Sequence, residues 1–167
     1  MKKVTLFLIG ITLTLVSYGQ KIEINSNGLF INSKKITRQT NTLFIQSLLG
    51  TPDRKFLKVN TIWTYDDLGI RVYINPETGD LKSISIDFEK EDYDFSPKKV
   101  YSGEMVIFGF YISRNTPIVS LKKIPELNFE DSPFQVYSAS TNYLNLTLQY
   151  LEDVTKLEAL GISFNNN

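Results

Sequence analysis

Apolar and polar residues alternate over two stretches of the chain, 69–75 and 81–88, with apolar residues at the even-numbered positions 70, 72 and 74 and at 84, 86 and 88. This alternation is typical of strands with one buried face. A further strand is predicted over 61–65, and the turn residues in 66–69 and 76–79 join the three. The three strands therefore predict an antiparallel meander with one face covered and the other open to solvent.

A helix is predicted just before this meander. Thr40 or Asn41 can cap it, and the apolar residues within 43–49 have helical spacing. Gly50 suits the left-handed conformation that ends a helix, and Pro52 cannot continue one. This helix is the natural cover for the buried face of the meander.

The segments on either side of this unit are shorter or irregular. We predict strands over 21–24 and 29–32, with a turn at 33–35. Residues 89–102 break the alternation and contain several acidic residues and Pro97. This segment is interpreted as a linker between two halves of the chain.

The second half of the chain repeats the order of these elements. The matched segments are 28–31 with 109–112, 52–56 with 125–129, 68–74 with 144–150, and 81–88 with 157–164. The last two pairs share one offset of 76 residues (144 − 68 and 157 − 81). Thr116 as cap and Pro117 at the first helical position predict a shorter second helix over 118–124. The alternative is two unrelated meanders that look alike because strands look alike.

These patterns predict an α+β fold. It consists of two tandem repeats, each with one or more strands, a helix and a three-stranded antiparallel meander, and the helices pack on one face of the sheets. The predicted domains are a signal peptide over 1–19, a first repeat over 20–95 and a second repeat over 96–167.

The N-terminus has the pattern of an export signal. Lys2 and Lys3 precede an apolar segment over 4–16, and small residues stand at Ser17 and Gly19. We predict cleavage after Gly19. A retained anchor helix is the alternative, but the apolar segment is shorter than the roughly 20 residues that a membrane span needs. We therefore expect a periplasmic or secreted protein that does not insert into a membrane after cleavage.

The amino-acid composition excludes several kinds of functional site. The chain contains neither Cys nor His. This excludes disulfides, lipid attachment to a cysteine, imidazole zinc sites and catalytic triads built on His. The 18 basic and 18 acidic residues balance, so the basic face that nucleic-acid binding requires is absent. We expect neither a cofactor nor a metal, and no enzymatic activity.

The loop after the first predicted helix carries a family resemblance. Leu49, Gly50 and Pro52 form an L-G-x-P sequence, followed by Trp63 and Tyr65 in a W-x-Y strand. This pattern resembles the SmpA/OmlA group of bacterial envelope proteins, whose fold is shared by the β-lactamase inhibitor protein, a tandem of two such units. The resemblance implies an α+β fold and an envelope location. The missing Cys and the added strands before the helix depart from it. The whole chain is also similar to secreted bacterial proteins, which implies no activity.

The candidate binding residues follow from the alternation. If even-numbered strand residues face the helices, the odd-numbered ones form an open face that includes Ser83, Ser85, Thr147 and Ser163. Tyr and Arg are residue types that anchor protein interfaces. The residues predicted to bind a partner are Tyr65, Arg71, Tyr73, Asp87, Tyr137, Tyr143, Asn145 and Gln149. Trp63 is interpreted as a core residue, and ordinary strand positions are the alternative for the tyrosines.

Two acidic groups offer other chemistry. Asp66 and Asp67 could be a catalytic carboxylate pair, although adjacent Asp residues usually form turns. The four acids within 89–94 could bind Ca²⁺, but they lack the glycine and the closing Glu of a calcium loop. A solvated acidic linker is the preferred interpretation of that segment.

Three functions remain as hypotheses. The preferred one is a non-catalytic exported protein that binds another protein through its open sheet face, as an inhibitor or an immunity protein. The alternative is an envelope assembly or scaffold component related to SmpA/OmlA-type proteins. A hydrolase that uses Asp66 and Asp67 is the third.

Overall fold

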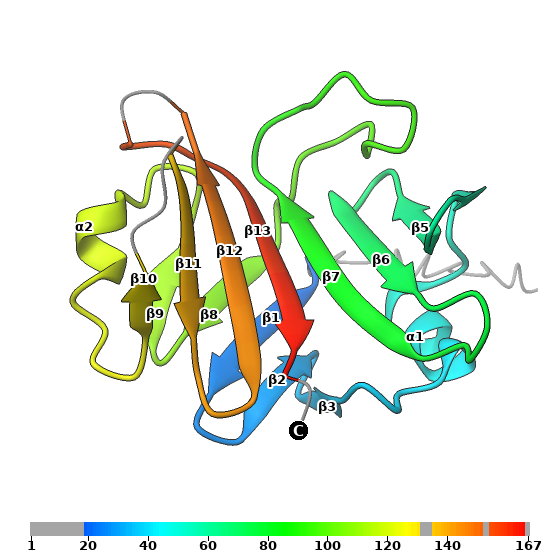
Figure 1. The fold of residues 1–167 in the computed structure, drawn as a ribbon. Helices are drawn as coiled ribbons and strands as arrows, with labels where there is room; N and C mark the ends of the chain where they lie inside the picture. Colours follow the sequence, from blue (N-terminus) through cyan, green and yellow to red (C-terminus); the bar gives the residue numbers. More distant parts are fainter. Residues whose placement is uncertain (1–18, 131–134, 152–153, 166–167) are drawn as a thin grey trace, which may run out of the picture.

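Two β-sheets stacked over one core make up the molecule in the computed structural model (Figure 1). The structure describes residues 19–130, 135–151 and 154–165. Apart from Gly19, the predicted signal peptide lies outside the described residues. Within the described ranges, no helix is long and apolar enough to cross a membrane.

The larger sheet has eight strands within the described residues, and every neighbouring pair is antiparallel. In sheet order the strands are β10 (Asn128–Glu130), β11 (Val136–Ser140), β12 (Leu144–Tyr150), β13 (Leu157–Phe164), β7 (Leu81–Asp87), β6 (Ile70–Ile74), β5 (Thr61–Tyr65) and β4 (Arg54–Leu57). The meander predicted over residues 61–88 is confirmed as β5, β6 and β7, within a residue at each end.

The smaller sheet lies behind the larger one (Figure 1) and contains five strands of the described chain. In sheet order they are β3 (Lys34–Ile36), β2 (Gly28–Ile31), β1 (Lys21–Asn25), β8 (Glu104–Ile107) and β9 (Phe110–Ile112). The turn predicted at 33–35 is wrong, because Lys34 begins β3 and the chain reverses at Asn32 and Ser33, both at positive φ.

A single hydrophobic core fills the space between the two sheets. Ile22 and Ile24 enter it from the small sheet, and Val72, Ile84 and Leu146 enter it from the large one. Full burial of each such side chain stabilises the fold by about 1.5–3 kcal/mol. The pattern of alternate apolar residues thus marks the two faces that press together.

The predicted α+β fold with helices covering the sheets is wrong, because the chain is mostly β. The described residues contain two short helices, α1 (Thr42–Leu49) and α2 (Ile118–Leu121), which lie at opposite flanks of the sheets (Figure 1). Eight helical residues are about 12 Å long, whereas eight strands span about 34 Å. The small sheet therefore provides the second layer.

The predicted ends agree with the structure for α1 but not for α2. Asn41 caps α1 by accepting a hydrogen bond from the amide of Phe44 at 2.8 Å, and Gly50 ends the helix at φ 86°. The second helix is shorter than the predicted 118–124, and Pro117 occupies the cap position instead of the first helical turn. Both helices insert apolar residues into the core from its sides.

Strands β7 and β13 join the two halves of the large sheet. Ser85 lies opposite Gly161, and Ile84 lies opposite Ile162. The pairing is therefore symmetric about two residues that the 76-residue offset relates (85 + 76 = 161). The small sheet does not share this symmetry, because β1 and β8 run parallel. The duplication itself stays a prediction.

Candidate functional site

Residues 89–100, which we call the strap, cover the outer face of the large sheet at the end of β5–β7 that contains Thr64 and Arg71 (Figure 1, the green loop at the top). The outward side chains of Thr64 and Arg71 are only 0% and 6% exposed. The Thr64 hydroxyl donates to the Phe95 carbonyl at 2.9 Å, and the Phe95 ring lies 5.6 Å from the Arg71 guanidinium carbon. The expected open face is therefore wrong over this half, because the predicted linker itself covers it.

Asp66 fastens the strap to the sheet. Its carboxylate receives a two-point contact from Arg54, with Nε at 3.1 Å, and pairs with Nζ of Lys98 at 3.2 Å. Its carbonyl accepts the amide of Lys99 at 2.9 Å. Burial alone would raise the pKa of Asp66, but the hydrogen bonds from Arg54 and Lys98 outweigh burial and lower it. Asp66 therefore has a structural role as an anchor.

A buried charge cluster lies beneath the strap. The guanidinium of Arg71 contacts Asp87 at 2.5 Å and Glu91 of the strap at 3.3 Å. Ser85 donates a hydrogen bond to Asp87 at 3.1 Å, and Tyr73 is half-buried beside them. Burial raises the pKa of Asp87, and the positive charge of Arg71 opposes that rise. Arg71 thus holds the strap through Glu91, Asp87 holds Arg71, and both buried residues are closed to an external partner.

The acidic groups do not assemble a catalytic or metal site. Asp66 is buried in its ion pairs, whereas Asp67 is exposed and pairs with Lys99 at 2.8 Å. Among the residues that the structure describes, no three His, Cys, Asp or Glu side chains lie where they could hold a metal ion. Asp66 and Asp67 therefore do not converge as the hydrolase hypothesis requires.

Two predicted binding residues face the core instead of the solvent. Trp63 lies opposite Val72 and Tyr137 opposite Leu148, so the odd-numbered residues of β5 and β11 point inward. Tyr65 is 1% exposed, and Tyr137 makes an edge-to-face contact with Tyr150. The assignment of Tyr65 and Tyr137 to the open face is wrong, because the register of β5 and β11 turns their odd-numbered residues toward the core. The core position of Trp63 is confirmed.

The outer face over β11–β13 is open. Strand β12 alternates three buried leucines with the exposed side chains of Asn145, Thr147 and Gln149. Ser138 and Ser163 continue this polar surface on the neighbouring strands and are half-buried. We call these five residues the open face. Tyr143 lies at its border and is 52% exposed.

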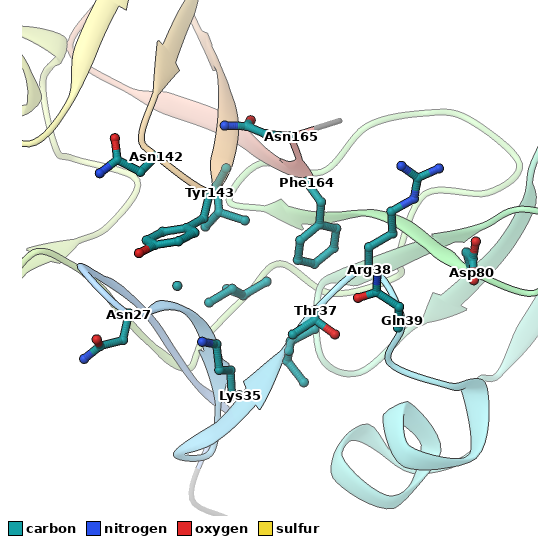
Figure 2. A pocket seen from close by; sticks show the side chains of 14 residues that line it. Asn27, Lys35, Thr37, Arg38, Gln39, Asp80, Asn142, Tyr143, Phe164 and Asn165 are labelled. Atoms are coloured by element: carbon teal, nitrogen blue, oxygen red, sulfur yellow. The ribbon is translucent and has the colours of Figure 1, made fainter. Parts of the chain in front are cut away.

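A hollow of about 430 Å³, which we call the end pocket, opens beside Tyr143. Figure 2 shows Tyr143, Phe164 and Asn165 on one side of it, with Lys35 and Thr37 on the other. Sequence reasoning identified Tyr143 and missed the other four. They lie far apart in the chain, and only the packing of the hairpin β2–β3 against the ends of β12 and β13 brings them together.

The family of the chain is decided by a match that covers more than half of its residues. A family model described as "Domain of unknown function (DUF7738)" matches residues 21–122. The chain belongs to the DUF7738 family. The match covers β1 to α2, which includes the strap and its anchor Asp66, and it ends before the strands of the open face. No curated protein matches the chain.

A solved structure shares the fold. It is described as a 1.5 Å crystal structure of an extracellular protein containing a SCP domain from Bacillus anthracis str. Ames. The TM-score is 0.50 at 9% identity, over 75% of this chain and 43% of that chain. This chain thus spans less than half the length of that protein, and the likeness concerns the fold alone. Neither comparison bears on the resemblance to the SmpA/OmlA group.

Proposed function

We propose that this DUF7738 protein is an exported, non-catalytic protein that binds another protein through its open face. The observation that carries the proposal is the exposure of Asn145, Thr147 and Gln149 along β12, above three buried leucines. The sheet backbone beneath these side chains is already ordered, so it loses little freedom when a partner binds, which favours affinity. The corresponding face of the first half is occupied by the strap.

The chemistry of the open face supports protein recognition. Ser, Asn and Tyr are enriched in antibody binding sites, where hydroxyls and amides supply adaptable hydrogen bonds and Tyr supplies rigid contact area. The open face and Tyr143 have this composition. The side chain of Gln149 donates to Glu158 at 2.9 Å, which orders one edge of the face. Inhibition of the partner, as by an inhibitor or an immunity protein, is the specific role we propose.

Export is proposed on two grounds. The first 19 residues have the pattern of a cleavable signal, and the structural neighbour is an extracellular protein. We expect N-terminal sequencing of the exported protein to begin at Gln20.

The binding proposal is tested by placing positive charge on the open face. Thr147→Arg and Gln149→Arg should each weaken binding to an envelope partner by about tenfold or more, because an unpaired charge must then be desolvated. Ser120→Arg on α2 is the matched control, since Ser120 is exposed on another surface. The measurement is the affinity of the purified variants for the partner captured by the wild type.

The outcome decides between the roles. Loss of binding in both open-face variants, with the control unchanged, supports the proposal, and inhibition of the captured partner supports the inhibitor or immunity role. Capture of outer-membrane assembly proteins would instead favour the scaffold alternative. Equal binding by all variants would refute recognition through the open face.

A further inference from the structure

The end pocket carries an inference beyond protein binding. It is built from five separated segments, and its volume of about 430 Å³ lies in the range of small-molecule sites. Its floor is apolar, since the buried side chains of Leu29, Ile36 and Leu144 line it. A second hollow of about 520 Å³, which we call the side pocket, adjoins it through the shared residues Arg38 and Phe164.

The walls of the end pocket are fixed by hydrogen bonds. The hydroxyl of Thr141 accepts the amide of Tyr143 at 3.2 Å, and the amide of Asn165 donates to the Tyr143 carbonyl at 3.1 Å. On the other wall, the Arg38 carbonyl accepts the amide of Leu81 at 3.1 Å. Both walls are therefore held in place before a ligand arrives, which lowers the cost of binding.

The described residues that line the two pockets include more basic than acidic side chains. Lys35 and Arg38 line the end pocket, and Lys82 lines the side pocket. Asp80 is the one carboxylate among their described lining residues, and it lies at the far side next to Arg38 (Figure 2). Within the described chain, Lys35 forms no ion pair, and its side chain points up toward the space below Tyr143 (Figure 2). This arrangement favours an anionic ligand.

The neutral lining indicates which anion fits. Four carboxamides line the end pocket (Asn27, Gln39, Asn142 and Asn165), and three line the side pocket (Asn60, Asn75 and Asn145). A carboxamide both donates and accepts hydrogen bonds, as a sugar hydroxyl does. The rings of Tyr143 and Phe164 stand on the same side of the end pocket (Figure 2) and offer flat apolar surface to a pyranose ring.

We propose that the end pocket and the side pocket bind an acidic saccharide. A carboxylate of the sugar pairs with Lys35, the hydroxyls bond to the asparagine carboxamides, and one sugar ring lies against Tyr143 and Phe164. The adjoining side pocket accommodates a neighbouring sugar unit, with Arg38 between the two units. No bond is made or broken in the ligand.

The proposal is tested by isothermal titration calorimetry with trigalacturonic acid, maltotriose and triglutamate. We expect trigalacturonic acid to bind at least about tenfold more tightly than either of the others, because maltotriose lacks the charge and triglutamate lacks the hydroxyls. Lys35→Gln should weaken its binding by about tenfold, through loss of a charge-assisted hydrogen bond. Tyr143→Ala should weaken it as well, through loss of the ring.

Lys34→Gln is the matched control, since Lys34 is exposed on the same strand and outside both pockets. Absence of binding by trigalacturonic acid, or equal binding by Lys35→Gln and the wild type, would overturn the proposal. Equal binding of triglutamate would overturn the assignment to a sugar. Thr147→Arg keeps saccharide binding, because Thr147 lines neither pocket, so failure here is distinct from failure of protein binding at the open face.

Discussion

The two halves of the large sheet present the same strand pattern to opposite environments. Arg71 and Thr147 are related by the 76-residue offset (71 + 76 = 147) and both point outward, yet Arg71 is buried and Thr147 is exposed. The difference arises from the strap, which crosses the first half only. The comparison shows that alternation in a sequence identifies the outward face of a strand but does not tell whether that face meets solvent.

The strap and the face beneath it have complementary charges. Arg54 and Arg71 project from the sheet, and Glu91 of the strap pairs with Arg71. On β12 the outward residues of the second half are uncharged, and the glutamates Glu130 of β10 and Glu158 of β13 lie at the edges of the open face. The first half thus uses its polar residues to bind its own chain, which leaves the second half as the recognition surface.

The largest effect is expected from Asp87→Ala, which removes a partner of Arg71 beneath the strap. Loss of one member of a buried ion pair costs about 3–5 kcal/mol, because the other charge stays buried. Ser163→Ala is the control at the offset-related position (87 + 76 = 163) of the open face, where we expect a change within about 0.5 kcal/mol. The free energy of unfolding in urea measures both. Equal effects at the two positions would contradict the difference between the halves.

A smaller effect is expected from Gly69→Ala. A Cβ atom at Gly69 would stand 2.2 Å from the amide nitrogen of Tyr101 and 2.5 Å from the carbonyl carbon of Val100, at the end of the strap. This clash adds to the cost of a positive φ of 68° and gives about 2–4 kcal/mol of destabilisation.

Gly79→Ala separates the cost of the steric clash from the cost of the positive φ. Gly79 has a similar φ of 73°, but nothing lies within 4 Å of the site of its Cβ. We expect Gly79→Ala to lower the free energy of unfolding by about 1–2 kcal/mol, the backbone cost alone. A loss for Gly69→Ala no larger than this would show that the strap end does not press on Gly69.

A stability effect of about 1–3 kcal/mol at pH 7 is expected from Asp66→Asn, which weakens the charged contacts to Arg54 and Lys98. The pKa of Asp66 is lowered in the folded protein. Its stabilisation is therefore complete above the ordinary carboxyl pKa of about 3.9 and is lost as the pH falls through the lower folded value.

Urea unfolding of the wild type and of Asp66→Asn at a series of pH values tests whether the stabilisation by Asp66 is lost at low pH. The difference in the free energy of unfolding should be constant above about pH 5 and should shrink below about pH 4. Faster amide exchange at Lys98 and Lys99 in the variant would show that the strap has loosened. A difference that does not depend on pH would contradict the role of Asp66 as a charged anchor.

Local signals in the sequence were sufficient to predict the first helix and several strands of the fold. Asn41 and Gly50 mark the ends of α1 through their cap chemistry, and strands β5 to β7 follow from alternation and turn residues. The outward position of Thr147 follows in the same way. These features depend on neighbours in the chain, which a single sequence displays.

The missed features depend on contacts between distant segments. The strand register places Trp63 opposite Val72 and Tyr137 opposite Leu148, so odd-numbered residues of β5 and β11 lie on the same face as even-numbered residues of their neighbours. Tyr65 and Tyr137 therefore face the core. The strap covers Arg71 through contacts across the sheet, and the end pocket combines Lys35 with Tyr143. The strands β3, β4 and β10 have only three or four residues each and depend on pairing with a neighbouring strand, so their own residues gave no pattern.

Site-specific photo-crosslinking at Gln149 and Tyr73 tests the central claim most directly. The two positions are related by the same offset (73 + 76 = 149), but Gln149 lies on the open face and Tyr73 lies half-buried near the strap. We predict one crosslinked partner from a photoreactive residue at Gln149, lost when Thr147→Arg is added, and none from Tyr73. Equal crosslinking from both positions, or crosslinking from Tyr73 alone, would contradict the account.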